Sequence, residues 1–580
     1  MVAVALFAAA GGVAGSAGAQ AAGPPVPPPA EPSVPPPASA AIEPAGPPTT
    51  TDLDVLFIER LPRYDYDAAK NNPVPGDVVT FRAHVKNWGP AALSPDYRWD
   101  IDGVPTASGT AANIGSNEDR VLTLDWVWQA GDHTVRLAVD VANAIPEVSE
   151  ANNAVEDRIN GIIVGFWVEQ SVYDYFHSYQ KNLPGVGSNS WEDWAQRQMR
   201  YWNQFSASAI YTTTPQGVLD RVRIDKIVVV PDGALPLHGG LPTNHPDLQD
   251  RTVDMMWGFP ATLLSGGMYS NTTSTSMSNP FFYEGSLLHE LGHARYLIDA
   301  YGFDVHNTAA HHSVQIYEGS TYVAGSAYMP FLAFGEVLYY NKYGKMMSGG
   351  YDQGWSEYDA GALNRIAGCR ARCGNYNAPC NIGEFLQDLP ENNHVQILDQ
   401  YGRPRPGAYV RLYRAVGDYQ SWYGKTFDNI PDAEYTADRN GYIHLPRNPF
   451  TDGGPIRHWW GEANGVLILR IAHSGQIWYR FQEVTDFNIQ YWRGNTQDAY
   501  YAVAVSGANA DFFADYDRDG DTDVADFATF QRCFNGPGRP RPATCSADAD
   551  YDDDGDVDVN DFAVFQTCFN GPGNLPACIP

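Results

Sequence analysis

The chain has 580 residues, of which 44% are hydrophobic and 13% are aromatic, and its formal net charge is −31 at pH 7. A chain of this length exceeds what one hydrophobic core organises, so the sequence predicts several domains. The net charge excludes non-specific binding to nucleic acids or anionic membranes, because these partners are themselves negatively charged.

The N-terminal segment indicates export and contains no candidate core. The apolar run Val2–Val13 is too short to cross a bilayer and is followed by a small-x-small site at Ala17–Ala19. We therefore expect a signal peptide over residues 1–19 and an extended Pro- and Ala-rich linker over residues 20–50. No later segment reaches the length of a membrane helix, so we expect a secreted or cell-surface protein without a membrane span.

Residues 51–162 contain short runs in which apolar and polar side chains alternate, such as Val78–Phe81 and Arg120–Leu124. Alternation with a period of two indicates strands that bury one face, so this region is predicted to be a β-sandwich. Recurrent motifs accompany the runs: Pro75-Gly76-Asp77, Asn87-Trp88-Gly89, Gly131-Asp132-His133 and Glu147-x-x-Glu150-x-Asn152-Asn153. Together they resemble the bacterial cell-adhesion-related (CARDB) immunoglobulin-like module, which implies a spacer or binding domain.

Residues 163–391 mix strand-like and helical segments. Strands are predicted at Ile162–Val164 and Ile224–Val230, and a Trp-rich helix is predicted at Trp191–Phe205. Alternation of strands with helices indicates a mixed α/β domain.

A zinc-binding pattern, His289-Glu290-Leu291-Gly292-His293, lies on a helix predicted at Leu287–His293. Positions i and i+4 share one face of a helix, so His289 and His293 can direct two imidazole nitrogens at one ion about 2 Å away. Glu290 lies roughly 100° round the helix from His289. There it can hold a zinc-activated water, accept its proton and pass that proton to the leaving amine. We therefore predict a zinc metallopeptidase of the HExxH type.

Two further features resemble the metzincin peptidases, whose motif is HExxHxxGxxH or HExxHxxGxxD. Asp299 stands where that family places its third zinc ligand. Downstream, Lys345–Tyr351 resembles the Met-turn, and Trp355–Gly368 resembles the helix that closes the catalytic domain. The resemblance implies that Asp299 is the third zinc ligand and that Met347 forms the apolar floor beneath the ligands. It also makes Tyr351 a candidate transition-state donor.

One position departs from the metzincin pattern. The motif has glycine where the chain turns to bring back the third ligand, whereas this chain has Tyr296. A tyrosine adopts positive φ only at an energetic cost. If the turn is delayed to Gly302, either Asp304 or His306 becomes the third ligand. Glu318 is a further alternative, as in gluzincins, and the sequence leaves these alternatives open.

Residues 392–506 return to β-patterns. Val395–Gly402 and Asp438–Tyr442 resemble the carboxypeptidase-regulatory-like β-sandwich that follows many secreted peptidases. We predict a second sandwich here and assign it no chemistry.

Residues 511–580 contain two copies of one aspartate-rich pattern. In each copy, positions 1, 3, 5, 9 and 12 offer carboxylates, position 7 adds a carbonyl oxygen, and glycine at position 6 permits the tight turn. Each copy is followed by an apolar helical segment, Phe527–Phe530 or Phe562–Phe565. The predicted calcium-binding residues are Asp515, Asp517, Asp519, Asp521, Asp523 and Asp526 in the first copy, and Asp550, Asp552, Asp554, Asp556, Asp558 and Asp561 in the second.

The paired loop–helix repeats resemble type I dockerin modules. Such modules pair with cohesin domains, so the resemblance implies about two bound Ca²⁺ ions and a cohesin-like or cell-surface partner.

Seven cysteines in an exported chain predict disulfides. Two similarly spaced pairs and one cluster are present: Cys533 with Cys545, Cys568 with Cys578, and Cys369 with Cys373 and Cys380.

The sequence as a whole predicts a multidomain protein. We expect an α/β (α+β) metzincin-like catalytic domain between two β-sandwiches, followed by an all-α calcium-loop module. The expected function is a secreted zinc metalloendopeptidase that cleaves protein or peptide substrates with Glu290 as general base. The alternative is a non-catalytic surface adhesin or matrix-binding protein with a protease-like fold. The intact Glu290 favours the enzyme, because an inactive site does not need a base.

Overall fold

A computed structural model describes the larger part of the chain. The described residues are 51–183, 186–235, 250–261, 284–298, 300, 303–308, 313–318, 321–327, 337–340, 345–348, 354–371, 383–399, 401–414, 431–456, 458–459, 462–463, 465–473, 476–505, 516, 522–539, 542, 545, 549, 551 and 556–569. For the strands between 303 and 340, and at 286, 348, 458–459 and 462–463, the description covers the backbone alone.

The chain divides into two compact units. Unit 1 comprises Met1–Ala209, Gln216–Arg295 and Ile366–Ile382, and unit 2 comprises Ile210–Pro215, Tyr296–Arg365 and Gly383–Pro580. None of the described helices has both the length and the apolar character that crossing a bilayer requires.

Unit 1 begins with a β-sandwich made of two antiparallel sheets. One sheet has the order β1-β2-β5 and the other the order β4-β3-β6-β7. The strands are β1 (Leu53–Leu61), β2 (Val78–Asn87), β3 (Asp96–Ile101), β4 (Val104–Thr110), β5 (Asp119–Val127), β6 (Thr134–Val139) and β7 (Ala154–Arg158). Every second residue of β2 is buried, which is the predicted alternation, and Phe81, Trp99 and Leu137 lie fully buried in the core.

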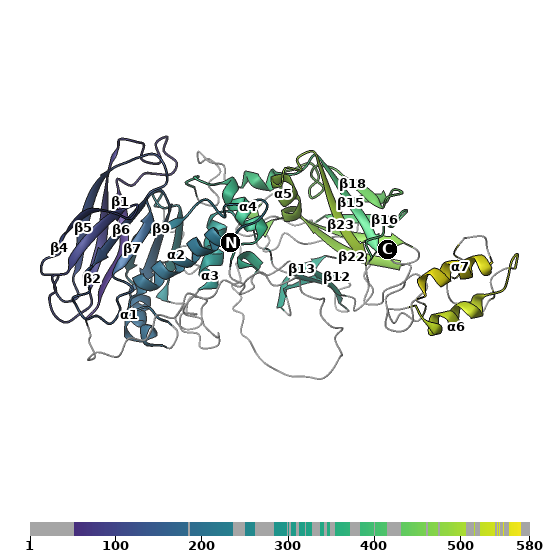
Figure 1. Cartoon of the computed structure of the whole chain (residues 1–580), viewed down its shortest axis with the longest axis horizontal. Helices are drawn as coiled ribbons and strands as arrows, with labels where there is room; N and C mark the ends of the chain where they lie inside the picture. The colour runs from purple at the N-terminus through teal and green to yellow at the C-terminus, as the bar shows by residue number, and fades with distance from the viewer. Residues whose placement is uncertain are drawn as a thin grey trace. The chain divides into compact units, whose positions relative to one another are not determined.

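The rest of unit 1 contains a parallel sheet with the order β10-β8-β9. Its strands are β8 (Ile162–Glu169), β9 (Val222–Val230) and β10 (Met255–Phe259), and its helices are α1 (Gln170–Ser178), α2 (Trp191–Ser208) and α3 (Gly285–Ala294). All residues of β8 are buried, as expected for a central parallel strand. Helix α2 packs against both β1 and β9, so it joins the sandwich to the parallel sheet (Figure 1).

Helix α2 begins where its sequence predicts. Ser190 is the N-cap residue, and its hydroxyl accepts the Asp193 backbone N–H at 2.9 Å. Glu192 and Asp193 in the first turn complement the positive end of the helix dipole. Trp191, Trp194 and Trp202 are buried, which explains the Trp-rich pattern.

Two buried arginine clusters reinforce unit 1. In the first, Asp225 of β9 accepts the backbone N–H of Arg60 at 2.7 Å and pairs with Arg223 at 2.8 Å and Arg63 at 2.9 Å. This cluster links the last residues of β1 to β9.

In the second cluster, the guanidinium of Arg370 lies 3.0 Å from a carboxylate oxygen of Asp254, at the start of β10. Asp254 also accepts the backbone N–H of Ile163 in β8 at 2.9 Å. The remaining Arg370 donors reach backbone carbonyls of Tyr64, Asn71 and Thr252.

Unit 2 begins with a four-stranded antiparallel sheet of order β13-β12-β11-β14. These strands are β11 (Phe303–Thr308), β12 (Ser313–Glu318), β13 (Thr321–Ala327) and β14 (Val337–Tyr340). They are followed by a 3₁₀ turn, η5 (Met346–Ser348), and by helix α4 (Glu357–Arg365). The sequence did not predict this sheet, whereas η5 and α4 fall within the segments expected for the turn and the closing helix.

A three-stranded and a four-stranded sheet of unit 2 lie in the region predicted to be a second sandwich. Their orders are β18-β15-β23 and β17-β16-β21-β22. The elements are η6 (Glu384–Gln387), β15 (Asn392–Asp399), β16 (Tyr409–Arg414), β17 (Ala433–Thr436), β18 (Tyr442–Leu445), a short hairpin of β19 (His458–Trp459) and β20 (Glu462–Ala463), β21 (Val466–His473), β22 (Gln476–Glu483), α5 (Val484–Trp492) and β23 (Asp498–Val505). Trp492 of α5 stacks on Tyr358 of α4, with ring centroids 5.6 Å apart.

The C-terminal repeats each contain one short helix, α6 (Val524–Cys533) and α7 (Val559–Cys568). Phe530 of α6 and Phe565 of α7 are buried, with ring centroids 5.0 Å apart. The predicted disulfide between Cys533 and Cys545 is present. Cys369 and Cys568 are also disulfide-bonded, and their predicted partners lie outside the described residues.

The second arginine cluster yields a stability prediction. Arg370→Ala removes the cation that neutralises the fully buried Asp254, so unit 1 should lose about 3–5 kcal/mol. Arg251→Ala is the matched control, because its side chain is half exposed where it pairs with Asp65, and it should cost less than about 1 kcal/mol. Hydrogen exchange of the β8 and β10 amides measures both changes. Equal losses would contradict the role of Arg370.

Candidate metal sites

The histidine helix α3 is anchored at its start and along its buried face. The backbone N–H of Glu284, directly before α3, donates to the Gln198 side-chain oxygen of α2 at 2.8 Å. Leu287, Leu288 and Leu291 are fully buried, and α3 packs against β10. The leucines of the motif therefore hold one face of the helix in the core of unit 1, as the sequence predicts.

His289 and His293 point to the same place on the other face of α3. Their Nε2 atoms are 3.1 Å apart, and both side chains are buried. Two nitrogens that each lie about 2.0–2.1 Å from a tetrahedral ion are separated by roughly 3.3 Å, which is close to the observed spacing. The described pair therefore fits two ligands of one zinc ion. Glu290 lies between them in sequence and is partly exposed.

Arg295 fixes the end of α3. Its guanidinium donates to the carbonyls of Ala371 at 2.8 Å and Cys369 at 2.9 Å, and lies 3.9 Å from the carboxylate of Asp220. Burial lowers the pKa of the Arg295 guanidinium, and the charges of Asp220 and Asp254 oppose that shift. Arg295, directly after α3, is thus held by the segment that carries Arg370.

The chain turns sharply at Tyr296. Helix α3 ends at Ala294, and Tyr296 adopts φ = 69°, in the left-handed region. Because of this turn, the helix does not continue toward Gly302. The metzincin motif has glycine at the position of Tyr296. The unfavourable backbone is compensated by packing, because the Tyr296 ring is buried and meets Phe385 edge to face at 6.2 Å.

The third-ligand candidates differ in what is described of them. Asp299 and Tyr351 lie outside the described residues. Asp304 and His306 lie on β11, and Glu318 ends β12, but only their backbone is described.

Met347, predicted to form the apolar floor, is fully buried in η5. Its carbonyl accepts the backbone N–H of Ala300 at 2.7 Å, which ties η5 to the segment that follows Tyr296. The backbone N–H of Met346 donates in turn to the carbonyl of Gly354 at 3.0 Å. These bonds make η5 a closed turn next to the residue that follows Asp299 in sequence.

Packing on Tyr296 can be tested through Gly383. A methyl group at Gly383 would lie 2.4 Å from the Tyr296 ring, whereas one at Gly354 would have nothing within 4 Å. Both glycines have positive φ, 104° and 115°, so alanine strains the two backbones similarly. Gly383→Ala should therefore destabilise unit 2 by about 1–3 kcal/mol more than Gly354→Ala. Calorimetric unfolding measures this difference in stability. Equal stabilities of the two variants would show that the Tyr296 ring moves aside without cost.

The calcium-loop residues are described in part. Asp515, Asp517, Asp519, Asp521, Asp550, Asp552 and Asp554 lie outside the described residues. Asp523 and Asp558 are N-caps of α6 and α7, and Asp526 and Asp561 complete a capping box at each helix. In the second loop, Asp556, Asp558 and Asp561 are buried and bring three carboxylate oxygens within 4.8 Å of one another.

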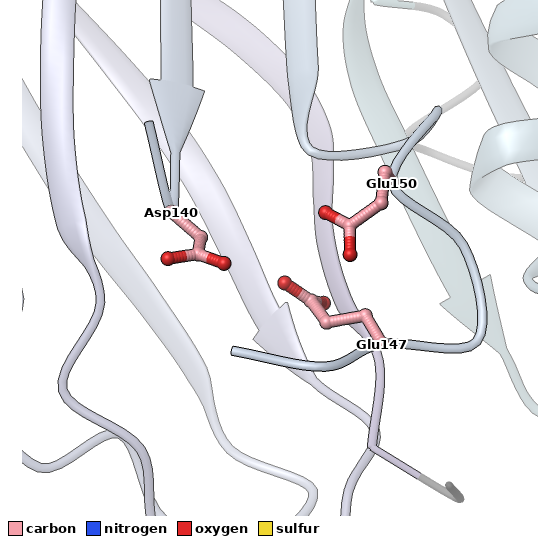
Figure 2. A group of neighbouring side chains, drawn as sticks. All are labelled: Asp140, Glu147 and Glu150. Atoms are coloured by element: carbon pink, nitrogen blue, oxygen red, sulfur yellow. The ribbon is translucent and has the colours of Figure 1, made fainter. Parts of the chain in front are cut away.

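A second acidic group lies in the sandwich and was not predicted as a site. Asp140, Glu147 and Glu150 point toward one another in the loop between β6 and β7 (Figure 2). Burial raises the pKa of Glu147 to about 7, and the charges of Glu150 and Asp52 add to the shift. Because that pKa is above its usual value of 4.5, the folded protein binds the proton more tightly than the unfolded chain does. The free energy of unfolding should therefore fall as the pH rises from 4.5 to about 7.

Hydrogen bonds within the loop account for this acidic group. Asp140 accepts the backbone N–H groups of Ala144 and Ile145. Glu147 accepts the backbone N–H of Leu53 in β1, and the side-chain amide of Asn153 donates to both Glu147 and Glu150. The motif Glu147-x-x-Glu150-x-Asn152-Asn153 thus fastens the β6–β7 loop to β1.

Comparison with known proteins assigns the N-terminal sandwich. Residues 52–157 match the CARDB family model, so this part of the chain is a CARDB domain and the predicted resemblance is confirmed. Comparison with curated proteins gives no match.

Two solved structures illustrate the likeness. A CARDB domain from Pyrococcus furiosus, described as a complex with di-metal ions, is 26% identical and covers 19% of this chain and 87% of its own, with a TM-score of 0.16. A domain of a putative cell surface protein from Methanosarcina acetivorans is 23% identical and covers 18% of this chain and 90% of its own, with a TM-score of 0.15.

Proposed function

We propose that this protein is an exported zinc metalloendopeptidase with a CARDB spacer domain. The single observation that carries the proposal is the buried pair His289 and His293, whose Nε2 atoms converge to 3.1 Å on one face of α3. Such a pair beside a partly exposed Glu290 suits a hydrolytic metal site better than a structural one, which is normally closed by four protein ligands.

The residues of this chain divide the chemistry between them. His289 and His293 would hold the ion, which would supply an acidified water as nucleophile when bound. Glu290 would accept the proton of that water and deliver it to the amine of the departing peptide. Arg295 and the leucine face of α3 keep the two histidines in register, so that the ligand geometry does not have to be formed at each turnover.

The turn at Tyr296 supports Asp299 as the third ligand. A left-handed residue at this position sends the chain back directly after the helix, and Ala300 is bonded to the buried Met347. The turn therefore falls at the position of the motif's glycine and not at Gly302, and this favours Asp299 over Asp304 and His306.

The first test replaces the base. Glu290→Ala should abolish cleavage of a protein substrate such as casein while leaving zinc content unchanged, because both histidine ligands remain. Zinc analysis of the purified protein and a cleavage assay measure the two quantities. Unchanged turnover would refute the proposed mechanism. Absence of both zinc and cleavage in the unmodified protein would favour the alternative, a non-catalytic surface adhesin built around the CARDB domain.

A second test identifies the third ligand. Asp299→Ala should lower zinc occupancy and cleavage together, because two histidines alone hold zinc weakly and leave its geometry unfixed. His306→Ala and Glu318→Ala are the matched controls and should keep most of both. Full zinc occupancy in Asp299→Ala combined with loss in His306→Ala would assign the ligand to β11 and argue against a metzincin-like site.

We further propose that the C-terminal repeats form a calcium-binding, dockerin-like anchor for a cohesin-like or cell-surface partner. The proposal is supported by two equivalent capped helices, the buried pair Phe530 and Phe565, and the cluster that contains Asp556 and Asp561. Three close, buried carboxylates repel one another, so a divalent cation should stabilise them.

Calcium should therefore order the repeats. Addition of Ca²⁺ to the full chain should slow hydrogen exchange in α6 and α7, and EGTA should reverse the effect, because metal binding and folding are coupled. The amides of β15 provide the internal control and should not respond. Identical exchange of α6 and α7 with calcium and with EGTA would contradict a calcium-dependent module.

A further inference from the structure

The outer face of the sheet β18-β15-β23 carries a pair of histidines that no predicted site uses. His394 of β15 and His444 of β18 are direct cross-strand partners in the antiparallel pairing. Their neighbours Val395 and Ile443 are buried, so strand alternation puts both histidines on the face away from the core. The His444 side chain is 61% exposed and that of His394 is 17% exposed.

The two rings meet through their Nδ1 atoms, which are 2.7 Å apart. The opposite nitrogen of His394, Nε2, lies 3.0 Å from the carboxylate of Asp498 in β23. A carboxylate oxygen accepts hydrogen bonds, so in the neutral His394 ring Nε2 carries the proton and Nδ1 keeps its lone pair. Asp498 therefore sets the tautomer of His394 in the way that carboxylates do behind metal-bound histidines.

We propose that His394 and His444 form a surface site for a divalent transition metal of the Ni²⁺ or Cu²⁺ type. Two nitrogens about 2 Å from one ion and at right angles to each other lie roughly 2.8 Å apart, close to the observed 2.7 Å. Right-angled ligands belong to octahedral and square-planar ions.

The surroundings hold the pair in place and keep one side open. The Tyr500 ring lies 4.8 Å from the His394 ring and covers it, and Tyr442 meets Tyr500 edge to face at 5.9 Å. Asp438 lies 4.0 Å from Nε2 of His444, beyond hydrogen-bond length. Two protein ligands leave further coordination positions for water or for an outside histidine or carboxylate. A bound ion would also clip β15 to β18.

Nickel titration of the zinc-loaded full-length protein tests the proposal. Isothermal calorimetry should detect one Ni²⁺ site that is lost in His444→Ala, a substitution at an exposed position. Asp498→Asn should keep the site but weaken it about 10- to 100-fold, which is the usual cost of losing a carboxylate behind a histidine ligand. His473→Ala, on β21, is the matched control and should leave nickel binding unchanged.

Electron paramagnetic resonance with Cu²⁺ supplies a direct readout of the ligands. The unmodified protein should show coordination by two imidazole nitrogens, and His394→Ala and His444→Ala should each remove that signature. Equal nickel affinity in the unmodified protein and in His444→Ala would overturn the proposal and leave the pair as an ordinary hydrogen bond between two histidines. Equal affinity in Asp498→Asn would overturn the positioning role of Asp498.

Discussion

The short segment Cys369–Ala371 fixes the position of the histidine helix within unit 1. Its two outer carbonyls accept hydrogen bonds from Arg295, directly after the helix, and its central side chain, Arg370, pairs with Asp254 at the edge of the parallel sheet. Arg295, Arg370 and Asp254 are all buried, so water cannot replace a hydrogen-bond partner that one of them loses. Separating these partners would leave a buried charge uncompensated, so movement of the segment away from the helix end is energetically costly.

The same physics joins the CARDB domain to the parallel sheet. Asp225 of β9 holds Arg60 and Arg63 from the end of β1 and Arg223 from its own strand. Helix α2 packs across the same junction. Within unit 1 the sandwich is therefore part of one packed body with the sheet that carries α3. A spacer connected only by a flexible linker would not need buried charges at its boundary.

The groups of metal-type ligands among the described residues differ in the chemistry that surrounds them. His289 and His293 are buried on one helix face with their Nε2 atoms 3.1 Å apart, while His394 and His444 lie on an open sheet with their Nδ1 atoms 2.7 Å apart. Asp140 and its acidic neighbours converge as well, and backbone and amide groups donate hydrogen bonds to those carboxylates. Residue type alone does not define a metal site, because the free lone pairs left after hydrogen bonding decide what can be bound.

The sequence alone determined the features that depend on local periodicity and short motifs. These include the sandwich strands such as β2, the Trp-rich helix α2, the i and i+4 histidines of α3 and the helices α6 and α7, because each follows from spacing along the chain. Tertiary structure decided the rest. Tyr296 takes the left-handed turn that its own preferences oppose because Phe385 and Gly383 enclose its ring. Arg295 and Arg370 donate to backbone carbonyls that are distant in sequence. Every residue has such a carbonyl, so the sequence does not show which of them an arginine will bind.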